Sequence, residues 1–228
     1  MKVAVMQPYF FPFSGYFELI FQVDKFVFLD DVNFIKRGFI NRNSLLFEGR
    51  AKRFCVPVAK MSQNRKINEH VYLGDYQDFL GLVENAYSEK QHFSQAYKLL
   101  ARICSQQDNN VASKNIASIE ATTSLIGIET QFLKSSDLPI DRDLRGQDKI
   151  IAICKTLGAD TYINPVGGSS LYDKNRFNDS GIRLEFFEPT LSRYPQGQID
   201  FISHLSIVDL IVSCSPKEAH GLIATRNI

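Results

Sequence analysis

The first 29 residues hold the pattern that most constrains the fold: an apolar run, a loop, a helical repeat and a second apolar run. Residues 3–6 are typical of a short buried strand, which ends at Gln7-Pro8. Apolar residues from Tyr16 to Val23 recur at helical spacing, and residues 26–29 form the second apolar run. This pattern predicts a β-loop-α-β unit with parallel strands. Because parallel sheets bind ligands beyond the carboxyl ends of their strands, we expect both loops to face one crevice.

The rest of the chain predicts an α/β protein with a parallel-sheet, three-layer core, either nucleotidyltransferase-like or Rossmann-like. Further strands are expected at 53–58, 71–73, 130–133, 161–163 and 182–187, and helices at 147–157, 205–212 and 216–223. Residues 76–126 carry helical periodicity, and Gly127 stands where a helix C-cap belongs. We therefore expect residues 1–75 and 128–228 to form the core and residues 76–127 a helical insert.

Composition and charge exclude several classes of protein. With 44% hydrophobic and 22% charged residues, the chain is expected to be globular rather than disordered. Because 26 Lys and Arg nearly cancel 25 Asp and Glu, no field of one sign exists to bind nucleic acid in bulk. A single phosphorylated ligand needs only a few local cations and backbone donors, so it stays compatible with this balance.

Cysteine spacing and hydropathy indicate the cellular compartment in which the protein is expected to fold. The four cysteines lie about fifty residues apart, without zinc or redox spacing, and are expected to be buried reduced thiols. The apolar run at the N-terminus is too short for a signal peptide, and no run of about 18 apolar residues occurs. We expect a cytoplasmic protein without membrane insertion.

The segment from Asp30 to Asn43 mixes polar residues with bulky apolar ones, as ligand sites do. On this interpretation three cations hold phosphate or carboxylate groups and three asparagines complete the polar set: Lys36, Arg37 and Arg42, with Asn33, Asn41 and Asn43. The alternative is an exposed charged loop pinned by Phe34 and Phe39.

Asp30 and Asp31 follow the second predicted strand directly. They are expected to act as a base or to coordinate a metal, because crowded carboxylates raise each other's pKa. The alternative is structural: one of them caps the next element or pairs with Arg37 or Arg42.

Polar and aromatic residues also follow the first predicted strand. Gln7 ends that strand, and the rings of the next residues, beginning with Tyr9, either stack on a base or sugar or cover the following helix. Gly15 is expected to leave the helix amides accessible to phosphate. The unit resembles the nucleotidyltransferase-type fold, but Gly15-Tyr16 stands in place of its Gly-His pair, which argues against ordinary adenylyl transfer.

Two later features extend the predicted site. The amides of the loop from Asn164 to Tyr172, with Gly167 and Gly168, are expected to cradle a phosphate or sugar, unless these glycines serve backbone geometry alone. Asp209 lies within an apolar run and needs a partner, either Ser206 or a site arginine, and is expected to orient rather than react. The isolated histidines are expected to be structural.

Several of these motifs together resemble the WbqC-like protein family. They are residues 6–12, 15–17, 30–43, 158–165, 167–168 and 205–209. Members of this family are typically encoded among genes for O-antigen and other surface polysaccharides. The resemblance implies work on nucleotide-activated or lipid-linked sugars, including addition of an amino acid or acyl group to an amino sugar.

The leading hypothesis is a transferase that modifies a nucleotide-linked amino sugar with an acyl or aminoacyl donor. Asp30 or Asp31 is the expected base, and Asn33 is the third expected catalytic residue. Gln7 and Asn33 are expected to orient polar groups of the substrate, and no cofactor is identified. Two alternatives stay open: a non-catalytic sugar-nucleotide binding or scaffolding protein, and a nucleotidyl-transfer enzyme of atypical motif. The sequence does not specify an oligomeric state.

Overall fold

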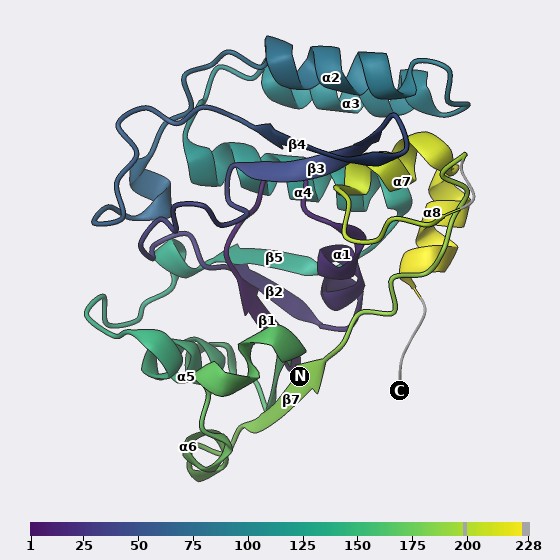
Figure 1. Cartoon of the computed structure of the whole chain (residues 1–228). Helices are drawn as coiled ribbons and strands as arrows, with labels where there is room; N and C mark the ends of the chain where they lie inside the picture. The colour runs from purple at the N-terminus through teal and green to yellow at the C-terminus, as the bar shows by residue number, and fades with distance from the viewer. Residues whose placement is uncertain (198–199, 225–228) are drawn as a thin grey trace.

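The centre of the molecule is a five-stranded parallel sheet with the strand order β5-β2-β1-β6-β7 (Figure 1). The computed structural model describes residues 1–197 and 200–224. The strands are β1 (Lys2–Met6), β2 (Lys25–Phe28), β5 (Gln131–Lys134), β6 (Thr161–Pro165) and β7 (Arg183–Phe187). β1 pairs with β2 from Val3↔Lys25 to Met6↔Phe28. The predicted α/β parallel-sheet fold is confirmed.

Helices and one antiparallel hairpin complete the described chain. The α-helices are α1 (Ser14–Phe21), α2 (Gln77–Tyr87), α3 (Phe93–Cys104), α4 (Val111–Ile126), α5 (Gly146–Leu157), α6 (Lys174–Asp179), α7 (Ile207–Ser213) and α8 (Pro216–Ile223). The 3-10 turns are η1 (Ile67–Glu69), η2 (Ser135–Asp137) and η3 (Val166–Leu171), and the hairpin is β3 (Arg42–Phe47) with β4 (Arg50–Cys55).

Both faces of the parallel sheet are buried, because alternate side chains of its strands enter two different apolar clusters. Val3, Val5 and Val27 pack in the cluster that contains Ile150 and Ile153 of α5. Ala4, Phe26 and Phe28 enter a larger cluster with α1, α3, α4, α7 and α8. Figure 1 shows α5 and α6 on one side of the sheet and α1, the hairpin and the other helices on the opposite side.

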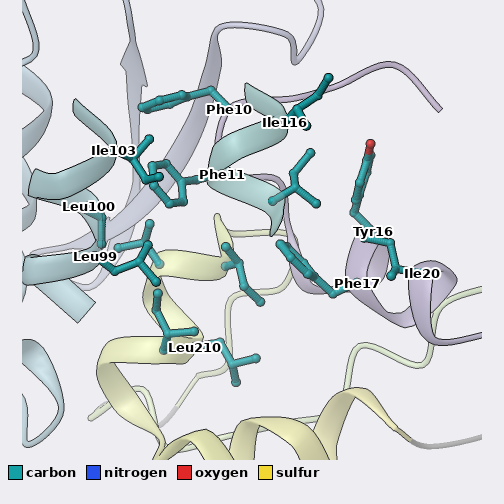
Figure 2. Close-up of a cluster of buried hydrophobic side chains, with 14 of the residues drawn as sticks. Phe10, Phe11, Tyr16, Phe17, Ile20, Leu99, Leu100, Ile103, Ile116 and Leu210 are labelled. Carbon is teal, nitrogen blue, oxygen red and sulfur yellow. The ribbon is translucent and has the colours of Figure 1, made fainter. Parts of the chain in front are cut away.

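The larger cluster joins segments that are distant in sequence (Figure 2). Phe10 and Phe11, from the loop after β1, lie among side chains of α3 and α4, and Phe17 of α1 extends the same cluster. Phe10 and Phe11 meet edge-on, with ring centroids 4.8 Å apart. These two rings therefore cover hydrophobic core, and the sequence alternative in which they stack on a ligand does not hold for them.

Two glycines end helices where the sequence predicts. Gly127 follows α4 with φ 71° and Gly158 follows α5 with φ 69°, both in the left-handed region that favours glycine. The segment 76–126 does form three helices, and Phe79 and Leu100 belong to the same apolar cluster as Phe17. The division of the chain into a core and an insert stays a prediction.

Several sequence expectations about strands and thiols are wrong. Arg42 and Asn43, assigned to a ligand site, begin the strand β3, because the hairpin turn at Glu48-Gly49 has φ values of 49° and 74° and pairs β3 with β4. The strand expected at 53–58 ends at Cys55, and residues 71–73 form only isolated bridges. Cys55 is exposed, whereas the other three cysteines are buried as expected.

Candidate functional site

A cavity of about 470 Å³ opens at the carboxyl ends of β1 and β2. Its polar lining comes from five places: Gln7 after β1, Asp31 and Asn33 after β2, Lys66 before η1, Arg145, Gln147 and Lys149 at the start of α5, and Tyr172 after η3. The chain adds β2 and β5 on one side of β1 and then returns to add β6 and β7 on the other side, so the strand order reverses beside β1, where the cavity lies. Parallel α/β sheets bind ligands at this point.

A larger open hollow of about 1320 Å³ lies at the amino ends of the strands, lined by residues such as Met1, Asp24 and Asp160. The N-terminal amine is already paired with Asp160, and Asp24 accepts the Lys2 amide at 2.7 Å. None of the residues that the sequence predicts for the site lines this hollow. The cavity at the carboxyl edge is therefore the candidate site.

Asp31 forms a buried ion pair at the floor of this cavity. Its Oδ2 lies 2.7 Å from Nζ of Lys149, and these side chains are 4% and 3% exposed. Arg142 lies 3.5 Å from the same oxygen, and the Ser135 hydroxyl donates to Oδ1. Burial raises the pKa of Asp31, but hydrogen bonds from Lys149 and Ser135 and the Lys149 charge outweigh it, so the pKa is lowered. The expected rise in pKa is wrong for Asp31, whose carboxylate is held ionised.

Asp30 is occupied differently, although it is adjacent in sequence. It accepts hydrogen bonds from the Ser136 amide at 3.0 Å and hydroxyl at 2.6 Å, from the Ser135 hydroxyl at 3.1 Å and from the Asn68 amide group at 3.2 Å. These bonds tie the loop after β2 to η2 and η1. Of the structural alternatives, the one in which a carboxylate bonds a following element fits Asp30, which accepts hydrogen bonds from η2 and η1. Neither carboxylate pairs with Arg37 or Arg42.

The cations that reach the cavity are Lys66, Arg145 and Lys149, which the sequence interpretation missed. Arg145 is the N-cap of α5 and forms no side-chain cap, so the first amides of the helix lack a capping side chain. Gly146 follows with φ 50° and no atom within 4 Å of the position that a Cβ would occupy. The helix itself was predicted at residues 147–157, but its N-terminus was not assigned to the site. Its position after a parallel strand was the sequence signal that could have indicated this assignment.

The three cations expected to hold phosphate lie outside the cavity. Lys36 and Arg37 are exposed on a turn, and Arg42 donates from Nε to the Gly38 carbonyl at 2.7 Å. The turn directs them outward, because Arg37 has φ 63° and the Gly38 amide bonds the Ile35 carbonyl at 3.2 Å. Asn33 and Ile35 of the same segment do line the cavity.

Asn41 and Asn43 are buried and bond to backbone. Asn41 donates from Nδ2 to the Val56 carbonyl at 2.8 Å, and Asn43 donates to the Phe11 carbonyl at 3.1 Å. Both amides connect the hairpin to neighbouring loops. The expectation that they face a ligand is wrong, because both amide groups are buried and donate their hydrogen bonds to backbone carbonyls.

Gly15 packs closely against its neighbours and Tyr16 bonds the backbone of Gln7, so the start of α1 is not open to a phosphate. A Cβ on Gly15 would lie 2.4 Å from the Phe13 ring, so close packing requires the glycine and leaves no room for a phosphate against it. The buried Tyr16 hydroxyl donates to the Gln7 carbonyl at 2.9 Å, and its ring lies 5.7 Å from that of Tyr9. Burial raises the pKa of Tyr16.

The loop after β6 reaches the cavity only through its end, at Leu171 and Tyr172. Asn164 is buried; its Oδ1 accepts from Tyr162 at 3.0 Å and its Nδ2 bonds the Pro165 carbonyl at 2.8 Å. A Cβ on Gly168 would lie 2.5 Å from Asn164 Nδ2, whereas Gly167 has open space around it. Gly168 thus serves close packing, and the expected phosphate cradle of this loop does not line the cavity.

Asp209 lies in the opposite layer, on α7, which packs against α3 and β3. Its side chain is fully buried, and Oδ2 accepts from Tyr194 at 2.8 Å and from Gln196 at 3.1 Å. Burial raises its pKa despite hydrogen bonds from Tyr194, Tyr87 and Gln196. Its predicted place in the crevice and its predicted partners are wrong, because the 194–196 segment supplies the donors.

Within residues 1–197 and 200–224, no group of three or more His, Cys, Asp or Glu side chains is placed to hold a metal ion. No helix in these same ranges is long and apolar enough to cross a membrane.

Comparisons with known proteins cover almost the whole chain. The family model of the WbqC-like protein family matches residues 7–220. The chain is also 30% identical over 215 residues to the uncharacterized protein Rv1507c of Mycobacterium tuberculosis (strain ATCC 25618 / H37Rv), which covers 92% of each chain. No solved structure gives a significant match.

Proposed function

Because the chain belongs to the WbqC-like protein family, which suggests a role among polysaccharide gene-cluster functions, we propose a transferase that modifies a nucleotide-activated amino sugar of O-antigen-type surface polysaccharide. It joins an acyl or aminoacyl group to the sugar amine. The single observation that carries the proposal is the carboxyl-edge cavity, where three cations and the start of α5 face Gln7 and Asn33.

The diphosphate of the substrate would bind at the start of α5. Lys66 and Arg145 supply positive charge, and the first amides of α5 supply donors that no N-cap side chain occupies. Helix N-termini and arginine forks are both suited to phosphate oxygens. Gln7 and Asn33, from the loops that follow β1 and β2, would orient the polar groups of the sugar.

Asp31 is the carboxylate in the lining of this cavity. In the proposed reaction the sugar amine attacks the activated acyl carbon, an amide bond forms and the leaving group departs. Asp31 accepts a hydrogen bond from the amine and directs its lone pair, while the released proton goes to the leaving group or solvent. The low pKa of Asp31 suits such orientation better than proton storage.

Thermal-shift measurements with UDP-glucosamine, followed by mass spectrometry, test this proposal. The expected result is stabilisation by UDP-glucosamine and a new mass when acetyl-coenzyme A, or an amino acid with ATP, is added. Asp31→Asn and Arg145→Ala should abolish or strongly lower product formation. Full product formation by both folded variants would contradict the assignment.

A second candidate is a binding protein that presents a sugar nucleotide to a glycosyltransferase without turnover. The observation in its favour is the Asp31 carboxylate, which already has Lys149 and Arg142 as partners. Stabilisation by UDP-glucosamine with no new mass across all donors would select this candidate. A nucleotidyl transferase is less favoured, because Tyr16 is buried and bonded to the Gln7 carbonyl rather than open to a leaving phosphate.

A further inference from the structure

The mouth of the cavity carries exposed apolar side chains. Ile35, Phe39 and Leu171 are 50%, 61% and 70% exposed, and Ile35 and Leu171 also line the cavity. Phe39 belongs to the same turn as Ile35, and its ring lies 6.3 Å from that of Tyr9, next to the strand end that bears Gln7. Phe34 pins this loop at 1% exposure, whereas Phe39 does not, contrary to the exposed-loop alternative drawn from the sequence. We call Ile35, Phe39 and Leu171 the apolar rim.

Two exposed cations stand between the apolar side chains of this loop. Lys36 and Arg37 form no ion pair with another residue in the described part of the chain. The turn that presents them is fixed, because the Gly38 amide bonds the Ile35 carbonyl and Arg42 bonds the Gly38 carbonyl. The chain therefore holds two cations and two large apolar groups outward within five residues.

We propose that this surface docks on an anionic lipid bilayer. The apolar rim enters the headgroup region, while Lys36 and Arg37 contact anionic lipid phosphates and carboxylates. Amphipathic surfaces of this kind bind membranes by buried apolar area together with attraction of nearby cations. The net charge of the whole chain is only +1, so the long-range attraction between the whole protein and an anionic bilayer is weak. In this proposal the binding therefore depends on the local patch.

Docking in this orientation places the cavity mouth at the level of the lipid headgroups, since Ile35 and Leu171 belong both to the rim and to the cavity. The protein lies on the bilayer surface and does not span it. The inference does not depend on the proposed reaction, and either can fail without the other.

Co-sedimentation of the full chain with lipid vesicles tests the docking. Vesicles of phosphatidylcholine alone are compared with vesicles that also contain phosphatidylglycerol. The test variants are Ile35→Ser/Phe39→Ser and Lys36→Gln/Arg37→Gln. Leu73→Ser, at 65% exposure and outside the cavity, is the control for the first, and Lys52→Gln/Arg53→Gln, two exposed neighbours on β4, for the second.

We expect the parent chain to sediment with anionic vesicles and far less with neutral ones. Each lost cation should lower the partition coefficient roughly fivefold, and the Ile35→Ser/Phe39→Ser variant should lose at least as much. Both controls should bind like the parent. No sedimentation with anionic vesicles, or equal loss in the controls, overturns the proposal.

Gel filtration and thermal unfolding separate the remaining interpretations. If Ile35→Ser/Phe39→Ser changes the oligomeric state but not vesicle binding, the rim contacts a second copy of the chain and the membrane proposal is wrong. Thermal midpoints like that of the parent show that the test variants are folded, so a loss of vesicle binding then reports on the surface alone.

Discussion

At the scale of single residues, the Asp31–Lys149 pair determines the character of the site. Both side chains are almost completely buried and lie 2.7 Å apart. A buried pair of this kind offsets its own desolvation only while both partners are present. The site therefore contains an anion and a cation that stabilise each other and leave limited freedom for proton transfer.

Asp31→Asn should lower the free energy of unfolding by about 3–5 kcal/mol, because it leaves the Lys149 charge buried without its partner. Urea denaturation of the parent and the variant measures this difference. Asp137→Asn is the matched control: that carboxylate is 62% exposed beside Lys134, and its loss should cost less than about 1 kcal/mol. Equal effects of the two changes would contradict the assigned role of the buried pair.

The same pair predicts a pH dependence. The pKa of Asp31 is lower in the folded chain than the ordinary value of about 4, so its contribution is present above pH 4. It is lost as the pH falls from about 4 through the lower folded pKa. The stability difference between the parent and Asp31→Asn, measured in urea melts at each pH, should therefore stay constant above about pH 4 and shrink as the pH falls below about 4. A difference that also stays constant at these lower pH values would refute the lowered pKa.

Residue types at strand ends could be interpreted from the sequence, but their partners could not. Asp31 follows an apolar run that is easy to recognise, whereas Lys149 stands 118 positions later. Asn41 and Asn43 have the residue types of a ligand site, yet their donors go to buried carbonyls. Only the folded chain shows which carbonyl needs a donor.

At the scale of elements, glycine at the end of α4 gives a direct test of helix termination. Gly127→Ala should lower the free energy of unfolding by about 1 kcal/mol, because φ is 71° there and a Cβ disfavours that region. Gly81→Ala, within α2 and with no atom within 4 Å of the new Cβ, should instead raise it by about 0.5–1 kcal/mol. Thermal unfolding of both variants provides the comparison, and a stabilising Gly127→Ala would contradict the left-handed cap.

Regular elements with clear periodicity were predictable, and those that depend on long-range pairing were not. The parallel strands and α5 follow from apolar runs and a capping glycine. The β3–β4 hairpin was missed because Arg42 and Asn43 have the polar character of a binding loop, and pairing with residues 54 and 55 decides their conformation.

At the scale of the whole molecule, the cations that line the cavity differ from those that the sequence suggested for phosphate binding. Lys66→Ala and Arg145→Ala should each weaken binding of UDP-glucosamine by about 10- to 100-fold, because both side chains line the cavity. Lys36→Ala and Arg37→Ala should leave the affinity unchanged, because these residues point outward. Isothermal titration measures all four, and stronger effects from the second pair would restore the assignment made from the sequence.

The position of β1 at the centre of the sheet has a consequence for synthesis of the chain on the ribosome. Its neighbour β2 emerges at once, but its other neighbour, β6, pairs Lys2 with Thr161 and so appears only after most of the chain has been translated. One edge of the first strand stays unpaired throughout that interval. An open edge is a template for association with other chains, so nascent-chain chaperones should matter for this protein before its last two strands emerge.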